Sequence, residues 1–347
     1  GEAQPLTRFP EGTIRSFAWS PDGRTLAVAF RETEIERTEA AETERDASGA
    51  STPPWVIDDL FYRLDGDGYF GGQRVALYLV DVETGDHRVL FSRGSNPSFS
   101  YDWSPDGSEL VVASNLSREP LLTPWKDELF RVNASTGRTR KVPGLPSGWK
   151  TAARFSPDGK QLLFAGREGH ETWGVRNTHL FRCQLDGSRL TDLTGHTDYC
   201  LSAAVLSDSA EASFDVDYQF TPDGQHVLLN FGWHGATRIA TVPLAGGPVR
   251  LLTPASTSVV LGNCSHEGRL AVCTADATHL PEAGCAGLKG GRRLKELTVT
   301  PRTNFNGPLL NELVLAKPRE HWIESAEGTP IQCWVMSPPT PRRRRAP

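Results

Sequence analysis

The sequence predicts an all-β fold, a β-propeller of about five four-stranded blades. Three observations support this prediction: a five-residue phrase recurs five times, a second turn follows each of the first four copies, and the strands beside the turns alternate in residue size and polarity. Three or more copies of one supersecondary unit are typical of a repeat architecture. The fivefold recurrence favours propeller blades over the alternative, an ordinary β-sandwich with Pro/Gly turns.

The recurring phrase has the composition of a tight turn. A type I turn favours Ser at its first position, Pro at its second and Gly at its fourth. Proline fixes φ near the required value, Asp can bond its own backbone, and Gly tolerates a positive φ. Each copy is therefore expected to join two antiparallel strands. The copies are WSPDG at 19–23 and 103–107, FSPDG at 155–159, FTPDG at 220–224 and the degenerate CSHEG at 264–268.

An alternating strand and a second hairpin follow each of the first four copies. After the first copy, Leu26, Val28 and Phe30 alternate with smaller residues, which predicts a strand with one face more buried than the other. Two hairpins per repeat make four strands, the unit of a propeller blade, and the first blade is expected at about 14–92. The second turns are Thr84-Gly85, Thr136-Gly137, Asp186-Gly187 and Gly246-Gly247.

The interval between the first two copies indicates an insertion. From Asp22 to Asp106 the chain is about twice as long as a bare blade of roughly 40–50 residues, yet it contains only one second hairpin. Residues 31–54 are rich in Glu, Thr, Ala and Ser and have few bulky apolar groups, so we expect a mobile insertion there. Residues 55–72 are dense in aromatic side chains, which indicates an ordered loop that packs against another part of the protein.

Composition argues against several partner classes. The formal net charge is −5 without a basic bias, so we expect no nucleic acid partner. No stretch approaches 18 consecutive apolar residues, so we expect no membrane partner. The first ten residues lack a signal-peptide pattern, and six cysteines without CxxC spacing are expected to be reduced thiols. These features favour a cytoplasmic location.

The chain offers no complete catalytic constellation. It contains no G-x-S-x-G nucleophile elbow, no H-E-x-x-H and no P-loop. Asp65-Gly-Asp67-Gly resembles the start of a calcium loop, but Tyr69 occupies the next ligand position and no Glu closes it. His179 and His226 are interpreted as structural residues of strands. We therefore expect no catalytic residue, no cofactor and no metal in this chain.

Two segments resemble a known family. Residues 58–72 (DDLFYRLDGDGYFGG) resemble a propeller loop of acylaminoacyl-peptidase-like enzymes, which belong to the prolyl oligopeptidase family of serine peptidases. In that family the loop usually reads R-Y-R-x-x-G-x-G-Y and lies between the two hairpins of one blade. Residues 321–339 (HWIESAEGTPIQCWVMSPP) resemble the family's crossing from the propeller into the hydrolase domain. The resemblance covers nearly the whole chain, from Gly1 to about Pro339.

This resemblance implies a domain organisation. Family members usually have seven blades followed by an α/β-hydrolase domain. Residues 1–320 are then expected to form a partial propeller truncated at both ends, 321–340 the opening strands of a missing hydrolase domain, and 341–347 a disordered basic tail. Seven blades need roughly 51° per step and five about 72°, and close-packed blade interfaces do not stretch that far. We therefore expect an open arc.

The resemblance also implies a function. The family acts through a Ser-His-Asp triad and an acyl-enzyme in its hydrolase domain, and none of those three residues has a counterpart here. The propeller restricts access to short or unfolded peptides, and its inner loops can contact the end of the substrate. Arg63 and Tyr69 are the candidates for that contact, because Arg63 could pair with a carboxylate bidentately. In the alternative interpretation, Arg63 is structural and Tyr69 packs the base of the loop.

Three functions remain open. The first is the non-catalytic, substrate-selecting propeller part of an acylaminoacyl- or dipeptidyl-peptidase-like enzyme, inactive alone, with a peptide substrate and a hydrolase domain or chain as partners. The second is a free-standing Tol-type propeller that acts as a protein-binding scaffold. The third is an enzyme of another class, which is disfavoured because the chain shows no metal cluster and no paired acid and base. The segment 321–339 favours the first function.

Overall fold

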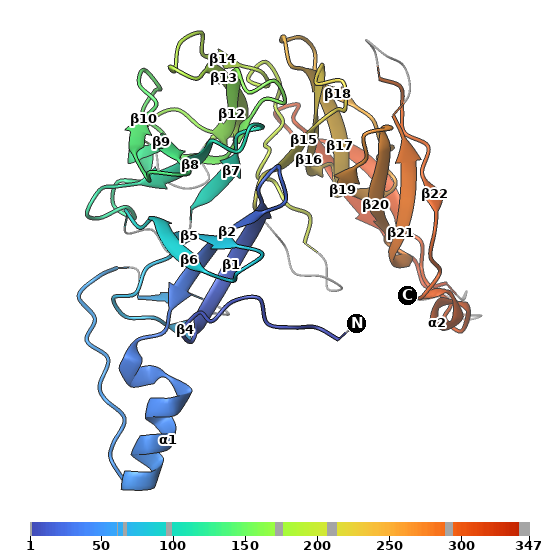
Figure 1. Ribbon diagram of the computed structural model, residues 1–347. Helices are drawn as coiled ribbons and strands as arrows, with labels where there is room; N and C mark the ends of the chain where they lie inside the picture. The colour runs from blue at the N-terminus through green and yellow to red at the C-terminus, as the bar shows by residue number, and fades with distance from the viewer. Residues whose placement is uncertain are drawn as a thin grey trace. The chain divides into compact units, whose positions relative to one another are not determined.

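Five four-stranded antiparallel sheets make up most of the protein (Figure 1). The structure, a computed structural model, describes residues 2–60, 62–64, 68–94, 99–170, 176–206, 214–288 and 294–339. In every sheet the strands pair in chain order, and a small hairpin interrupts the first sheet between its second and third strands. The predicted all-β fold of about five four-stranded blades is confirmed.

The chain divides into two units, Gly1–Asp192 and Leu193–Pro347, and each is described by itself. The open arc of blades stays a prediction. The first unit holds three sheets, with strands β1 (Gly12–Trp19), β2 (Thr25–Glu32), β5 (Ala76–Asp81) and β6 (His87–Phe91); β7 (Ser100–Trp103), β8 (Glu109–Asn115), β9 (Asp127–Asn133) and β10 (Thr139–Lys141); and β11 (Lys150–Phe155), β12 (Gln161–Gly166), β13 (His179–Gln184) and β14 (Thr191–Asp192). The second unit holds two sheets, with strands β15 (Asp217–Phe220), β16 (His226–Trp233), β17 (Ala236–Pro243) and β18 (Arg250–Leu251); and β19 (Ser258–Cys264), β20 (Arg269–Asp276), β21 (His279–Gly287) and β22 (Thr300–Pro301).

The remaining elements are short. They are the hairpin β3 (Arg63–Leu64) and β4 (Gly68–Tyr69), the 3-10 helices η1 (Ile35–Arg37) and η2 (Pro124–Lys126), the helices α1 (Glu39–Ser48) and α2 (Gly307–Asn311), and the hairpin β23 (Arg319–Glu324) and β24 (Pro330–Val335). No helix among the described residues is long and apolar enough to cross a bilayer.

One set of hydrogen bonds explains the recurring phrase. In the first copy the Ser20 hydroxyl donates to the Asp22 carboxylate at 2.6 Å and accepts from the Thr25 backbone N–H at 2.9 Å. Gly23 sits at φ +70° and donates its N–H to the Ser20 carbonyl, so the turn requires a residue that tolerates that φ. The same bonds recur in the next three copies, where Thr221 replaces Ser in the last of them. They lower the pKa of Asp106 to about 2, chiefly through the Ser104 hydroxyl.

The core lies between neighbouring sheets within each unit. In the first unit, Ala27 and Leu77 of the first sheet pack with Leu110 and Phe130 of the second. In the second unit, one cluster joins Leu228 to residues of the fifth sheet. The sequence predicted strands with one face more buried, but β2 is buried on both faces. The small residue Ala27 of β2 is buried on the other face, because the second sheet packs against it there.

The insertion carries a helix that the sequence analysis did not predict. Residues 31–54 include η1 and α1, and Figure 1 shows α1 standing clear of the strands of the first sheet. The Thr38 hydroxyl caps α1 by accepting the Ala41 N–H at 3.3 Å, and Gly49 ends it in the left-handed region. Alanine and glutamate favour a helix once such caps are present. The mobility of this segment in solution stays a prediction.

The hairpin β23–β24 covers most of the segment expected to open another domain. It packs on the turn between β16 and β17, where the Trp322 and His234 rings lie 4.9 Å apart. The Gln332 amide also donates to the His234 carbonyl at 3.2 Å. The assignment of the hairpin β23–β24 to a hydrolase domain stays a prediction. The expected basic tail at 341–347 lies outside the described residues.

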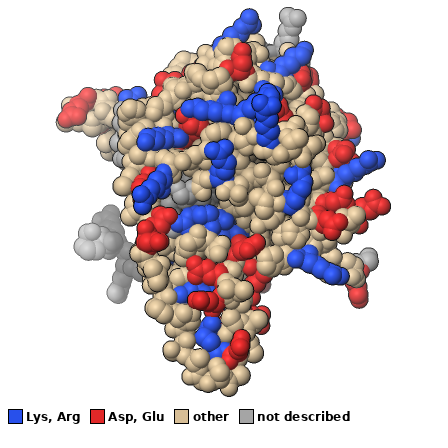
Figure 2. Space-filling model, turned by 60° about the vertical axis from the view of Figure 1, so that its left-hand side comes forward, with Lys and Arg blue, Asp and Glu red and all other residues tan. Residues whose placement is uncertain are grey.

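Acidic and basic side chains are mixed on the surface. On the face that Figure 2 draws, both kinds are interspersed among uncharged residues. This pattern agrees with the small net charge of the chain, which is −5.

Candidate functional site

Two kinds of connection leave opposite ends of the first sheet. Phe30 pairs with Ala76 and Leu26 pairs with Val80, so the insertion 33–75 leaves one end of the β2–β5 pair. The tight turns of the sheet lie at the other end, because they close β1–β2 and β5–β6. The candidate loop 55–72 therefore belongs to the end of the sheet that carries its longest connection. Long connections of this kind carry binding residues more often than tight turns do.

The two predicted residues meet in the hairpin β3–β4. Arg63 and Tyr69 are paired across the two strands, and the Arg63 guanidinium carbon lies 5.6 Å from the centroid of the Tyr69 ring. Both side chains are exposed, Tyr69 by 46%. The structure thus brings the two predicted residues together as a cation over an aromatic ring. Residues 65–67, which separate the two strands in the sequence, lie outside the described residues.

Tyr69 also belongs to an aromatic cluster. The Trp55 ring stacks on Tyr69 with centroids 5.5 Å apart and planes at 28°, and the Tyr62 ring lies 5.9 Å from it. Tyr69 therefore helps to pack the base of the loop, as in the alternative interpretation, while nearly half of it remains accessible. The geometry is compatible with a contact role and a packing role at once.

The loop is attached to the first sheet through its C-terminal end. Phe70 is only 5% exposed, and the Arg31 guanidinium lies 4.4 Å from the centroid of its ring. Arg74 forms an ion pair with Asp59 at 2.5 Å and donates to the Gly71 carbonyl at 2.9 Å. These contacts join the beginning and the end of the loop to each other and to β2.

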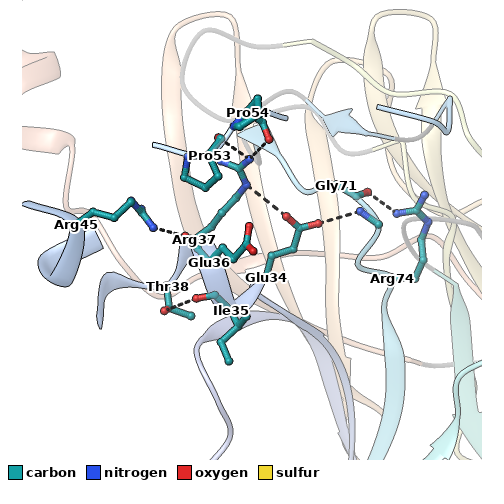
Figure 3. A network of polar contacts seen from close by, with 11 residues as sticks. Glu34, Ile35, Glu36, Arg37, Thr38, Arg45, Pro53, Pro54, Gly71 and Arg74 are labelled. Atoms are coloured by element: carbon teal, nitrogen blue, oxygen red, sulfur yellow. Dashed lines mark hydrogen bonds and ion pairs between the residues drawn. The ribbon is translucent and has the colours of Figure 1, made fainter. Parts of the chain in front are cut away.

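The short turn before α1 contributes a second set of contacts (Figure 3). Glu34 and Arg37 form an ion pair at 3.3 Å, and each side chain also reaches the loop or the segment leading into it. Sequence reasoning missed both residues, because the composition of 31–54 indicated a mobile segment. The only sequence signal was the close spacing of a Glu and an Arg.

Comparisons with curated proteins identify relatives that are peptidases. No protein-family model matches the chain. The chain is 27% identical over 344 residues, 97% of its length, to the uncharacterized peptidase YuxL of Bacillus subtilis. It is 22% identical over 250 residues, 69% of its length, to dipeptidyl-peptidase 5 of Porphyromonas gingivalis. The chain spans 49% of the first relative and 32% of the second.

Solved structures agree with this result at the level of the fold. Acylaminoacyl peptidase of Pyrococcus horikoshii matches 96% of the chain with a TM-score of 0.64 at 16% identity. A puromycin-hydrolyzing peptidase of Mycobacterium tuberculosis matches 96% with a TM-score of 0.57 at 15% identity. The chain covers 45% and 44% of these proteins. The chain therefore has the fold of a propeller portion of such peptidases.

This propeller portion also contains a cavity of about 840 Å³ in its second unit. The cavity lies beside the turn between β16 and β17 and is lined by apolar side chains and carboxylates, among them Asp276 and Glu320. Local donors already engage these two carboxylates: Thr278 and His279 bond Asp276, and Trp322 and Gln332 bond Glu320. The described residues contain no group of three or more His, Cys, Asp or Glu side chains that could hold a metal ion.

Proposed function

We propose that this propeller portion selects peptide substrates for a peptidase of short peptides, and that the loop 55–72 contacts the end of the substrate. The observation that carries the proposal is the exposed pair Arg63 and Tyr69 on a loop that is joined to the first sheet. The relatives with the names peptidase and dipeptidyl-peptidase support the substrate class. The bond-breaking residues belong to a hydrolase domain or chain, which acts through a Ser-His-Asp triad.

The two side chains offer complementary chemistry to a peptide terminus. The planar fork of a guanidinium matches the two oxygens of a carboxylate and adds directional hydrogen bonds to the charge attraction. The exposed ring of Tyr69 offers apolar area to the neighbouring side chain of the peptide. A peptide that presents a free carboxylate beside an apolar residue would use both groups.

Calorimetric titration of the chain with Ala-Ala-Phe and with Ala-Ala-Phe-amide tests the proposal. We expect the free acid to bind at least about tenfold more tightly than the amide, a difference of about 1.4 kcal/mol. Arg63→Gln should abolish this preference, because it removes the cation, while Arg63→Lys should keep only part of it. Arg140→Gln, an exposed arginine of β10, serves as the matched control and should leave the preference unchanged. Equal binding of acid and amide by the unaltered chain would refute the carboxylate contact.

A further inference from the structure

Both ends of the candidate loop are attached to one short turn. The helix η1 and the residue before it supply two side chains, of which Figure 3 shows Arg37 pointing toward Pro53 and Pro54 and Glu34 pointing toward the chain at Gly71. Arg37 reaches the chain where the loop begins, and Glu34 reaches it where the loop ends. A loop that is attached at both ends to one short element has fewer orientations open to it than a loop with free ends.

Arg37 fixes the start of the loop through two kinds of contact. Its guanidinium donates to the Pro53 and Pro54 carbonyls at 3.1 and 3.0 Å. The same group lies over the Trp55 ring, with its carbon 3.3 Å from the ring centroid. Only 14% of the Arg37 side chain is exposed, so these contacts are largely shielded from water. Desolvation strengthens a cation over a ring and hydrogen bonds to carbonyls alike.

Glu34 fixes the end of the loop. One carboxylate oxygen accepts the Gly72 N–H at 3.1 Å, and the other pairs with Arg37 at 3.3 Å. The carboxylate lies so close to Gly71 that a Cβ at that position would come within 2.0 Å of it. The absence of a side chain at Gly71 therefore permits this approach. The ion pair links the two attachments, so the start and the end of the loop are held relative to each other.

The attachment at Trp55 leads directly to the candidate site. Arg37 lies over Trp55, Trp55 stacks on Tyr69, and Arg63 lies over Tyr69. Successive pairwise contacts therefore link the two cations through the two aromatic rings. A displacement of Trp55 would therefore change the surroundings of Tyr69 without any change in the candidate residues themselves.

We propose that Glu34 and Arg37 are the positioning pair of the substrate loop, and that they set the orientation of Tyr69 and Arg63 through Trp55 and Gly72. The inference rests on the proposed function for what the oriented residues contact. It assigns residues 31–54, which no sequence motif distinguishes, the task of holding the loop in its binding orientation. Neither Glu34 nor Arg37 is proposed to touch the substrate.

Two measurements that involve no peptide test the positioning. The first is hydrogen exchange at the Gly72 amide, and the second is the near-ultraviolet circular dichroism of the Trp55–Tyr69 stack, assigned with Trp55→Phe. Glu34→Ala should speed exchange at Gly72 at least about tenfold, whereas Glu34→Gln keeps an acceptor oxygen and should change it much less. Arg37→Leu should remove most of the dichroism of the Trp55–Tyr69 pair, and Arg37→Lys should retain part of it. Glu44→Gln, an exposed α1 variant, is the matched control.

Titration of the same variants with Ala-Ala-Phe connects positioning to binding. We expect Arg37→Leu to weaken binding at least about fivefold although Arg63 and Tyr69 are intact. Unchanged exchange and unchanged dichroism in Glu34→Ala and Arg37→Leu would overturn the positioning pair, whatever the peptide result. Altered loop signals with unaltered peptide affinity would support the positioning pair and refute the proposed substrate contact. The positioning pair and the substrate contact can therefore be refuted independently of each other.

Discussion

Asp102 is an ionisable residue that connects the second sheet to the third. Its carboxylate accepts the Phe155 N–H of the third sheet at 3.2 Å. The corresponding residue in the fourth sheet is Gln219, which also precedes the aromatic residue of the turn phrase and donates to the Gly262 carbonyl of the fifth sheet at 2.6 Å. Burial raises the pKa of Asp102 to about 6, although the Arg154 charge and backbone N–H groups oppose the rise. The contact between the second and third sheets therefore uses a titratable group, Asp102, where the contact between the fourth and fifth sheets uses a neutral amide, Gln219.

The raised pKa predicts that Asp102 makes the fold less stable as the pH rises. The folded protein binds this proton more tightly than the unfolded chain, so its contribution is fully present below about pH 4 and is lost as the pH rises through about 6. Asp102→Asn keeps an acceptor for Phe155 and removes the charge. We expect the free energy of unfolding of the variant to exceed that of the unaltered chain by about 2 kcal/mol at pH 7.5. At pH 4 the two free energies should be equal.

Urea unfolding from pH 4 to pH 8 measures this difference. Asp127 contributes to the pH dependence of the unaltered chain, because burial also raises its pKa to about 6 against the bonds from Lys150 and Asn115. Asp127 makes the same contribution in both proteins, so it drops out when the free energies of unfolding of the variant and the unaltered chain are subtracted. Asp86→Asn, at an exposed turn, is the control. Parallel pH profiles for Asp102→Asn and the unaltered chain would show that Asp102 is not the group responsible.

At the level of elements, the docking of the hairpin β23–β24 depends on a glycine. Gly235 lies at φ +70° in the turn between β16 and β17, and a Cβ there would come within 2.7 Å of the Trp334 ring. We expect Gly235→Ala to cost about 1 kcal/mol in backbone strain and to push Trp334 away from the turn. The hairpin itself should persist, because its six backbone pairs involve only β23 and β24.

The fluorescence of Trp334, isolated by comparison with Trp334→Phe, reports this displacement. It should shift to the red in Gly235→Ala as the ring becomes more exposed. Gly23→Ala is a matched control, since Gly23 also has a φ of +70° but no atom within 4 Å of the added Cβ. An unshifted Trp334 emission would mean that the turn does not hold the hairpin.

At the level of the whole molecule, we predict that this chain alone hydrolyses neither peptides nor esters. The sequence contains no G-x-S-x-G elbow, the strained turn that exposes the nucleophile in α/β-hydrolases. A short chromogenic peptide and a p-nitrophenyl ester are the appropriate substrates. Turnover that survives repurification and is blocked by a serine-directed phosphonate would contradict the prediction.

The second hairpin of the fifth sheet shows where local pattern fails. Sequence reasoning assigned a second hairpin only to the first four repeats, but β21 and β22 complete the fifth sheet. β21 contains a proline and glycines, which disfavour a strand on local grounds. Its extensive pairing with β20 outweighs that preference, because the neighbouring strand supplies the hydrogen bonds.

The sequence by itself determined the turns, the first hairpins and the number of sheets, because the bonds between Ser20, Asp22 and Thr25 lie within six residues of chain and repeat wherever the phrase repeats. Its resemblance to a family loop over residues 58–72 singled out Arg63 and Tyr69, which pair across a hairpin. Only the tertiary structure decided that Glu34 would reach Gly72. That contact, like the burial that sets the pKa of Asp102, depends on the approach of segments distant in sequence, and no local periodicity records which distant groups will share a site shielded from water.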